Sequence, residues 1–225
     1  MKRKIVISQD GSSSVFDEQT KQHFHSQFGA IQESKHIFIE AGWRAANATN
    51  SSEITVLEIG MGTGLNILLT FLESIKDKKT VFYETVEKYP LTQKEVAQLN
   101  YLNFFNTQEA SHFFSKLHSC DWSKVQKLTP SFTFIKHHCC ALDFNYRQRF
   151  FNLVYFDPFS PEVQPELWTY DFFAKIALSM KPLGILVTYC IKGEVRRILK
   201  SLGFEIEKLP GPPGKREILR ACLQH

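Results

Sequence analysis

A carboxylate followed by a rigid proline and an aromatic ring ends one apolar run of the chain. The run NLVYFD closes with Asp157, and Pro158 and Phe159 come next. A carboxylate in such a place can orient an amine for an in-line displacement and stabilise the positive charge that develops on its nitrogen, and geometry supplies much of the acceleration in such a step. Asp157 is therefore the candidate catalytic residue. Alternatively, it only caps an ordinary turn, where Asp and Pro are common.

A glycine-rich turn stands between another apolar run and a helical pattern, in VLEIGMGTGLN (residues 56–66). Glycine lets a ligand approach the backbone, and the N–H groups of a helix start face a bound molecule. An acidic residue followed by glycines at alternate positions resembles the S-adenosylmethionine-binding turn, whereas dinucleotide enzymes use GxGxxG. A tight turn without a ligand is the alternative. The cofactor-binding candidates here are Glu58, Gly60, Gly62, Thr63, Gly64 and Asn66.

Further acids follow predicted strands and complete the candidate cofactor site. Glu87 ends the run TVFYETVE about 20 positions beyond the glycine turn, where a carboxylate is expected to bind ribose hydroxyls. Glu84 competes with it, and a plain surface charge is the alternative. Asp143, after the run FTFIKH, is a candidate for the adenine side or merely a loop residue. Asp157 is also expected to face the cofactor.

Apolar runs and helical patterns alternate along most of the chain. Strands are predicted for residues 54–59, 80–87, 132–137, 152–157 and 184–190 and for a hairpin around GPPGK. Helices are predicted for about 65–75, 90–102, 165–180 and 194–202, with further helical material within 103–130. In the 165–180 helix one buried face is expected to hold Trp168, Phe172, Phe173, Ile176 and Met180.

This alternation predicts an α/β fold of the class I, Rossmann-like kind found in S-adenosylmethionine-dependent methyltransferases. We expect a mostly parallel seven-stranded sheet with an antiparallel C-terminal hairpin. Residues 1–53 would form an N-terminal extension packed on the core, and residues 54–225 the Rossmann-like methyltransferase domain. The 225 residues suffice for one such domain, and 43% hydrophobic residues exclude a disordered chain.

Charge and composition limit the partners. The formal charge of +4 and the isoelectric point of 8.7 permit nucleic-acid binding without requiring it. No run of about 18 apolar residues and no signal-like segment occurs, which predicts a cytoplasmic protein without a membrane span. Five cysteines without CxxC spacing predict reduced and mostly buried thiols. The run HHCC at 137–140 invites a metal, but neighbours on a strand point to opposite faces, so no metal is expected.

Several segments together carry a specific resemblance that covers nearly the whole chain. FDPFSPEVQPELWT (156–169), with VLEIGMGTGLN, VEKYPL, the C-terminal stretch VTYCIKGEV to ILRA and the N-terminal HFHSQFGAIQESKHIFI, resembles the tRNA 5-methylaminomethyl-2-thiouridine methyltransferases. These are the stand-alone MnmD proteins and the methyltransferase half of the bifunctional MnmC proteins. The resemblance implies methylation of 5-aminomethyl-(2-thio)uridine at the tRNA wobble position with S-adenosylmethionine as donor. It places Asp157 at the catalytic acid and Gly60, Gly62, Gly64 and Glu87 at cofactor positions.

The resemblance also implies a partner and has two departures. The bifunctional relatives carry a flavin-dependent oxidase for which this chain has no room, so a separate flavin oxidase or another wobble-uridine modification enzyme is expected to supply the primary amine. Pro158 replaces a small residue of the family element. The run HHCC stands where the family pattern has an acid shortly after the third core strand, so the sequence does not identify the residue that contacts adenine.

Basic and aromatic residues are candidates for holding the tRNA anticodon region. Phosphate candidates are Lys192, Arg196 and Lys200 on one helix face, with Arg197 beside them, and Lys215 and Arg216 at the hairpin turn. A solvated basic face is the alternative. Phe159 stacks on a base or belongs to the core, and Trp168 fits the core better. Glu33, with His25 and Ser26, is expected to complete the uridine pocket; otherwise its segment only covers a sheet edge.

Three rival functions remain open on the sequence. The first is a methyltransferase of the same fold acting on a small-molecule or protein amine. The second is a non-catalytic RNA-binding module. A nicotinamide enzyme fits least, because the glycine spacing and the terminal hairpin differ from that class.

Overall fold

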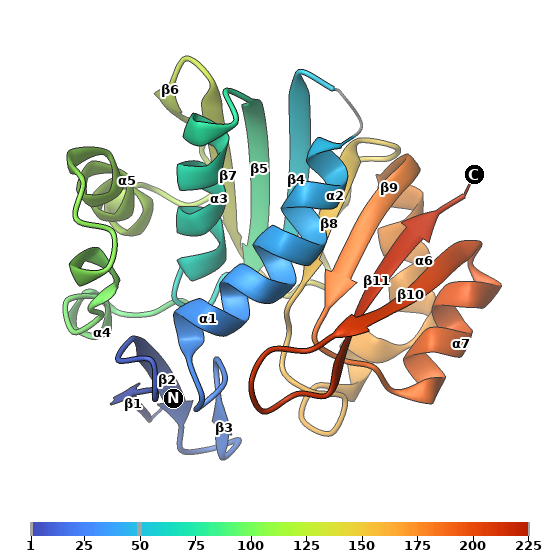
Figure 1. Cartoon of the computed structure of the whole chain (residues 1–225), viewed down its shortest axis with the longest axis horizontal. Coiled ribbons are helices and arrows are strands. Elements are labelled where there is room, and N and C mark those ends of the chain that lie inside the picture. The colour runs from blue at the N-terminus through green and yellow to red at the C-terminus, as the bar shows by residue number, and fades with distance from the viewer. Residues whose placement is uncertain (1, 49–50, 225) are drawn as a thin grey trace.

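The computed structural model describes residues 2–48 and 51–224, which form two sheets with helices around the larger one (Figure 1). Within these residues the larger sheet has eight strands in the order β10-β11-β9-β8-β4-β5-β7-β6. Their bounds are β4 Glu53–Ile59, β5 Thr80–Glu87, β6 Gln126–Thr129, β7 Phe132–His138, β8 Phe151–Phe156, β9 Met180–Thr188, β10 Phe204–Pro210 and β11 Glu217–Leu223.

The strand pairing confirms the predicted class of fold. Strands β9, β8, β4, β5 and β7 are mutually parallel, and β11 pairs antiparallel with both β9 and β10. The sheet has one strand more than the seven expected. Gln126–Thr129, placed by the sequence within helical material, pairs as β6 with the edge strand β7.

Alternating side chains of the central strands fill two apolar cores, one on each face of the sheet. Val56 belongs to one cluster and the next residue, Leu57, to the other, as the two-residue period of a strand requires. The second face is covered by η3 (Pro165–Trp168), α6 (Tyr170–Ser179) and α7 (Gly193–Ser201). The first is covered by α3 (Leu65–Lys76), α5 (Gln108–Ser119) and the consecutive segments α1 (Ala30–Ser34), η1 (Lys35–Trp43) and α2 (Arg44–Asn47).

The N-terminal residues pack closely on the sheet and also form a sheet of their own. Phe38 and Trp43 are buried in the first cluster. A Cβ atom on Gly42 would lie 2.9 Å from the side chain of Val187, so glycine allows the helix to approach β9. The small sheet consists of β1 (Arg3–Ile7), β2 (Ser13–Asp17) and β3 (Gln22–His23). We keep the division into an extension (1–53) and a core domain (54–225) as a proposal.

The predicted helix over residues 90–102 is wrong. The chain there forms only α4 (Gln93–Val96) and the 3₁₀ turn η2 (Tyr101–Asn103). The chain leaves the helix after Val96 and docks on the N-terminal sheet, where the side-chain oxygen of Asn100 accepts hydrogen bonds from the backbone and hydroxyl of Ser13, at 2.8 Å each. This contact ties the segment to β2, which no local pattern reveals.

Two further expectations need correction. The predicted 165–180 helix is divided at Thr169, whose side chain caps α6 by accepting the N–H of Phe172, although the five predicted apolar residues are all buried. The thiols are free but only Cys190 is buried; Cys120, Cys139, Cys140 and Cys222 are partly exposed. Cys139 and Cys140 follow β7 at a cavity wall, which explains their exposure. No helix within 2–48 and 51–224 has the length and apolarity of a membrane span.

Candidate active site

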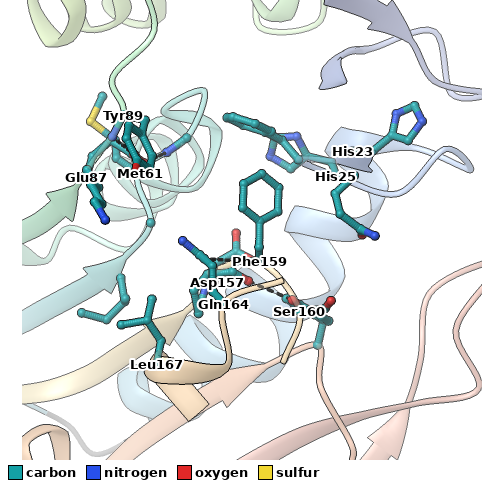
Figure 2. A pocket seen from close by; sticks show the side chains of 18 of the residues that line it. His23, His25, Met61, Glu87, Tyr89, Asp157, Phe159, Ser160, Gln164 and Leu167 are labelled. Carbon is teal, nitrogen blue, oxygen red and sulfur yellow. Dashed lines mark hydrogen bonds between the residues drawn. The ribbon is translucent and has the colours of Figure 1, made fainter. Parts of the chain in front are cut away.

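A cavity of about 380 Å³ lies where the parallel strands of the main sheet end, next to the N-terminal segment (Figure 2). Its walls come from the turns after β4, β5, β7 and β8, from residues 21–27 and from the turn between β10 and β11. Parts of the chain that are far apart in sequence therefore meet here. The candidate site residues from the sequence that line the cavity are His25, Ser26, Glu33, Gly60, Gly62, Glu87, Asp157, Phe159 and Lys215.

The glycine turn after β4 brings two backbone segments into contact. Gly60 has a φ of 89°, and a Cβ atom there would lie 2.7 Å from the carbonyl oxygen of Asp157. Only glycine fits both this conformation and this approach. Gly62 is also left-handed, with a φ of 52°, and donates its N–H to a carboxylate oxygen of Glu87 at 2.9 Å. At Gly60 and Gly62 the turn thus presents backbone without a side chain to the cavity.

Glu87 and Glu84 have different surroundings although both belong to β5. The second oxygen of Glu87 accepts the N–H of Tyr89 at 2.7 Å, so its carboxylate is fixed at the end of the strand beside the glycine turn. Glu84 is buried, hydrogen-bonds the ring of His137 and forms an ion pair with Arg147. Of the two competing acids, the structure brings Glu87 to the cavity.

Asp157 lies directly after β8, beside the glycine turn. Its N–H donates to the carbonyl of Ile59 at 3.0 Å, and its carboxylate accepts a hydrogen bond from the side chain of Asn66 at 3.0 Å. Burial raises the pKa of Asp157 well above its usual value, and the carboxylates of Glu33 and Glu58 add to the rise. A proton on this acid is therefore favoured compared with an acid in water.

Three side chains hold the loop after Asp157 by hydrogen bonds to its backbone. The hydroxyl of Tyr189 donates to the carbonyl of Pro158 at 2.8 Å. The N–H of Phe159 donates to Gln164 at 2.8 Å, and its carbonyl accepts the indole N–H of Trp168 at 2.8 Å. Trp168 is a core residue, as expected. Phe159 instead lines the cavity, where its ring contacts Phe24 edge to face with centroids 5.3 Å apart.

A partly exposed ion pair joins the N-terminal segment to the C-terminal hairpin at the cavity wall. The ammonium group of Lys215 lies 3.2 Å from one oxygen of Glu33 and 5.1 Å from the ring centre of Tyr189. The other oxygen of Glu33 accepts the N–H of Ser26 at 2.6 Å. Lys215, expected at the surface as a phosphate contact, thus turns toward the cavity.

Comparison with known proteins identifies the kind of enzyme. Residues 105–224 match the family model described as S-adenosyl-L-methionine-dependent methyltransferase. The chain belongs to this family. The methyltransferase is 26% identical over 240 residues to the tRNA 5-methylaminomethyl-2-thiouridine biosynthesis bifunctional protein MnmC of Aromatoleum aromaticum, with 96% of this chain and 35% of that protein covered.

Two other comparisons agree with this assignment. The MnmC protein of Hydrogenovibrio crunogenus is 27% identical over 239 residues, which cover 99% of this chain and 34% of that protein. The methyltransferase therefore spans about a third of the length of these curated relatives. The crystal structure of MNMC2 from Aquifex aeolicus superposes with a TM-score of 0.78 at 25% identity, covering 99% of this chain and 70% of that one.

The methyl donor of this family, S-adenosylmethionine, fits the residues around the cavity. Gly60 and Gly62 line the cavity with backbone alone, and Glu87 supplies hydrogen-bond acceptors beside them. On the far side of Glu87, the backbone after β7 contributes Cys139, Cys140 and Ala141 to the wall. The methyltransferase thus combines a bare turn with a fixed carboxylate, an arrangement suited to a polar nucleoside.

Three other cofactor-binding candidates, Glu58, Thr63 and Gly64, lie next to the cavity wall without lining the cavity. Glu58 is fully buried, accepts a hydrogen bond from the hydroxyl of Thr85 at 2.8 Å, and has its pKa raised by burial to about 8. Thr63 is buried and its hydroxyl accepts that of Tyr101 at 3.0 Å. Gly64 has a φ of 76° and precedes the first residue of α3.

The remaining predicted residues lie outside the cavity wall. Asp143 donates its N–H to the carbonyl of Cys140 at 3.1 Å but does not line the cavity. Lys192 forms an ion pair with Glu162, and Arg196 and Arg216 lie away from the lining. Within residues 2–48 and 51–224 there is no group of three or more side chains able to hold a metal ion.

Sequence reasoning missed several residues of the wall. Phe24, Met61, Tyr89 and Tyr189 all line the cavity. Met61 lies between Gly60 and Gly62, and Tyr89 follows Glu87 by two residues, so their position in the sequence could have indicated that they lie at the cavity. Phe24 had no signal of its own apart from the resemblance of its segment, because its approach to Gly62 depends on how β2 and β3 pack.

Proposed function

We propose that this enzyme transfers a methyl group from S-adenosylmethionine to the amine of 5-aminomethyl-(2-thio)uridine at the tRNA wobble position. The product is 5-methylaminomethyl-(2-thio)uridine. The observation that carries the proposal is the enclosed carboxylate of Asp157 beside a bare glycine turn. The names of the relatives, which refer to tRNA 5-methylaminomethyl-2-thiouridine biosynthesis, support this choice of acceptor.

Cofactor binding is assigned to the residues around the glycine turn. Gly60, Gly62 and Gly64 would place backbone against the donor, and Glu87 would accept hydrogen bonds from its ribose hydroxyls. Glu58, Thr63 and Asn66 would hold the turn and the acid behind it. S-Adenosylmethionine supplies an electrophilic methyl group on a sulfonium. The proposal leaves Asp143 without a role, since it does not line the cavity.

Asp157 is the proposed catalytic residue because the acceptor amine must lose a proton before it can attack. An aliphatic amine enters from water mainly as an ammonium ion, whose nitrogen has no lone pair. The raised pKa of Asp157 favours transfer of that proton to the carboxylate. The nitrogen–carbon bond then forms as the carbon–sulfur bond breaks, with the electron pair of that bond left on sulfur. The product leaves as a methylammonium ion beside neutral S-adenosylhomocysteine, and Asp157 returns the first proton to water. Asp157 is placed to orient the amine for this displacement.

Recognition of the acceptor would use the other cavity wall. Phe159 offers an aromatic surface on which a base can stack, and Glu33 adds a second carboxylate near the entering ammonium group. The exposed Arg216, together with Lys192 and Arg196 near α7, would contact phosphates of the anticodon stem. We also propose a cytoplasmic location and a separate enzyme, such as a flavin oxidase, that supplies the primary amine.

The experiment is methylation of defined RNA followed by nucleoside mass spectrometry. A tRNA anticodon stem-loop with 5-aminomethyl-2-thiouridine is offered beside the same RNA with unmodified uridine and beside small primary amines. We expect the mass of one methylene group to be added to the aminomethyl nucleoside alone. Methylation of small amines but not of this RNA would support an enzyme for a different acceptor and contradict the proposal.

A matched pair of variants tests the role of the carboxylate. Asp157→Asn removes the proton acceptor, whereas Asp121→Asn changes an exposed acid that pairs with Lys124 outside the cavity. We expect product only from the wild type and Asp121→Asn. Equal product from all three proteins would show that Asp157 has no catalytic role.

A further inference from the structure

His25 is a buried residue of the cavity wall, expected from the sequence to help complete the uridine pocket but without a defined chemical role so far. It follows β3, is 8% exposed and lines the same cavity as Asp157 and Phe159. Figure 2 shows Phe159 between Asp157 and His25 in that view. The hydrogen bonds that hold His25 involve its backbone N–H and its ring Nδ1, both directed to Ser14 of β2. Within the described residues, no partner is present at the other ring nitrogen, Nε2.

The contacts of Ser14 determine which ring nitrogen of His25 carries the proton. The hydroxyl oxygen of Ser14 accepts the N–H of His25 at 3.1 Å and lies 3.5 Å from Nδ1. Ser14 is 1% exposed, so its hydroxyl proton needs an acceptor inside the protein. Nδ1 is the acceptor that the geometry offers. The imidazole proton then resides on Nε2, which becomes a hydrogen-bond donor.

The imidazole is neutral in the physiological pH range. Burial lowers the pKa of His25 to about 4, and the carboxylate of Asp10 only partly opposes this effect. A neutral ring with its proton on Nε2 has no lone pair at that nitrogen with which to accept the proton of an ammonium group. It also lacks the charge that would attract a phosphate. What it can offer to a ligand is one directed N–H donor.

We propose that His25 donates this Nε2–H to a ring carbonyl oxygen of the pyrimidine whose aminomethyl group meets Asp157. The inference rests on the function proposed above and adds to it a recognition element for the heterocycle. Asp157 and Glu33 recognise the amine, which many small molecules also carry. A neutral donor selects instead for an acceptor atom on the ring, so His25 distinguishes a nucleobase from a simple alkyl amine.

Steady-state kinetics with two variants and a control test this role. His25→Leu removes the donor, and His25→Gln keeps an N–H group at a similar distance from the backbone. His112→Leu is the control, because His112 is an exposed histidine of α5 away from the cavity. We expect His25→Leu to raise the KM for the RNA about tenfold, the effect of one lost hydrogen bond. The KM for S-adenosylmethionine should stay within about twofold, which also shows that the variant is folded.

The outcomes separate this inference from the proposed function. We expect His25→Gln to recover most of the RNA affinity and His112→Leu to match the wild type. An active wild type with an unchanged RNA KM in His25→Leu overturns the role of His25 and leaves the proposed function standing. A rise in the KM for S-adenosylmethionine as large as that for the RNA also overturns it, because the residue then supports the cavity in general. A wild type that methylates no aminomethyluridine RNA overturns the proposed function itself.

Two further measurements examine the Nε2–H hydrogen-bond donor of His25 directly. Nitrogen-15 NMR of the histidine rings should show His25 neutral at pH 7 with its proton on Nε2; a cation, or a proton on Nδ1, overturns the inference without any activity assay. Stem-loops with sulfur in place of one ring oxygen, at C2 or at C4, identify the contacted atom. The wild type should discriminate at one of the two positions and His25→Leu at neither, whereas equal discrimination by both proteins contradicts the contact.

Discussion

The two halves of the cavity are built in different ways. The half that we propose binds the donor, formed by Gly60, Gly62 and Glu87 and called the donor half, follows strands β4 and β5, which are neighbours in the sheet. The half that we propose binds the acceptor, called the acceptor half, is formed by His25, Glu33, Phe159 and Lys215. It brings together the N-terminal segment, the loop after β8 and the C-terminal hairpin. Backbone contacts join the donor half to the loop after β8, where a Cβ on Gly60 would lie 2.7 Å from the carbonyl of Asp157. Side-chain contacts, such as that of Lys215 with Glu33, hold the acceptor half.

Because the two halves are built differently, substitutions in them should change different kinetic parameters. The position of the donor half follows from strand order, since parallel neighbours end at the same edge of a sheet. The acceptor half depends on tertiary packing of segments about 180 residues apart in the chain, as Glu33 and Lys215 are. Asp157 is coupled to both halves, because its carbonyl closely approaches Gly60 and its carboxyl group interacts electrostatically with Glu33 and Lys215. Variants should therefore change turnover at Asp157, donor affinity at the glycine turn and RNA affinity at the hairpin.

The largest effect is expected at the boundary between the halves. Asp157→Asn should lower kcat by about a thousandfold, within the usual range for loss of a general acid–base group, with both KM values little changed. Rapid-quench measurement of a single turnover checks this without interference from product release. A variant that loses RNA affinity but keeps its single-turnover rate would place Asp157 in the acceptor half instead.

Gly60→Ala should mainly damage the donor half. The new Cβ meets the carbonyl of Asp157, so we expect the KM for S-adenosylmethionine to rise by about tenfold or more, with a loss of stability of roughly 1–2 kcal/mol. Gly203→Ala is the matched control, because Gly203 has a φ of 87° but open space around a Cβ. It should lose a similar amount of stability and keep its donor affinity, which calorimetry with the donor can measure. Equal loss of donor affinity in both would assign the effect to backbone strain.

Lys215→Met should affect the acceptor half to a smaller extent. The substitution keeps the chain length but leaves the carboxylate of Glu33 without its cation, and a partly exposed pair of this kind is worth roughly 1 kcal/mol. We expect the KM for the RNA to rise about fivefold and the donor KM to stay unchanged. Lys208→Met serves as the control, since Lys208 pairs with Glu217 on the same hairpin outside the cavity. An identical rise in the KM for the RNA in both variants would mean that RNA binding depends on the positive charge of the hairpin and not on the contact of Lys215 with Glu33.

The last effect concerns stability and pH, and not turnover or affinity. Burial raises the pKa of Glu58 from 4.5 to about 8, so the folded protein keeps a proton that the unfolded chain releases. This group therefore lowers the free energy of unfolding as pH rises from 4.5 to about 8, and it contributes nothing below that window. Glu58→Gln should be more stable relative to the wild type at pH 8 than at pH 4.5, as measured by urea unfolding. A pH-independent difference would contradict the buried neutral acid.

The same contrast explains what could be predicted from the sequence. The glycine turn, Glu87 and Asp157 were predictable because each follows an apolar run that local patterns identify as a strand, and strand order does the rest. The helix predicted over 90–102 failed because the chain there docks on the N-terminal sheet through Asn100 and Ser13, a contact that no local pattern reveals. Lys215 was expected at the surface because its contact with the N-terminal segment is likewise absent from local sequence patterns. Its side chain turns inward to meet Glu33, a partner that local spacing does not reveal.

The most direct test of the account is a crystal structure of the enzyme with S-adenosylhomocysteine and an anticodon stem-loop that carries 5-methylaminomethyluridine. The account predicts the cofactor product along Gly60 and Gly62, with its ribose at Glu87 and the substrate nitrogen within hydrogen-bonding distance of Asp157. A cofactor bound elsewhere, or a uridine nitrogen that does not meet the carboxylate of Asp157, would contradict it.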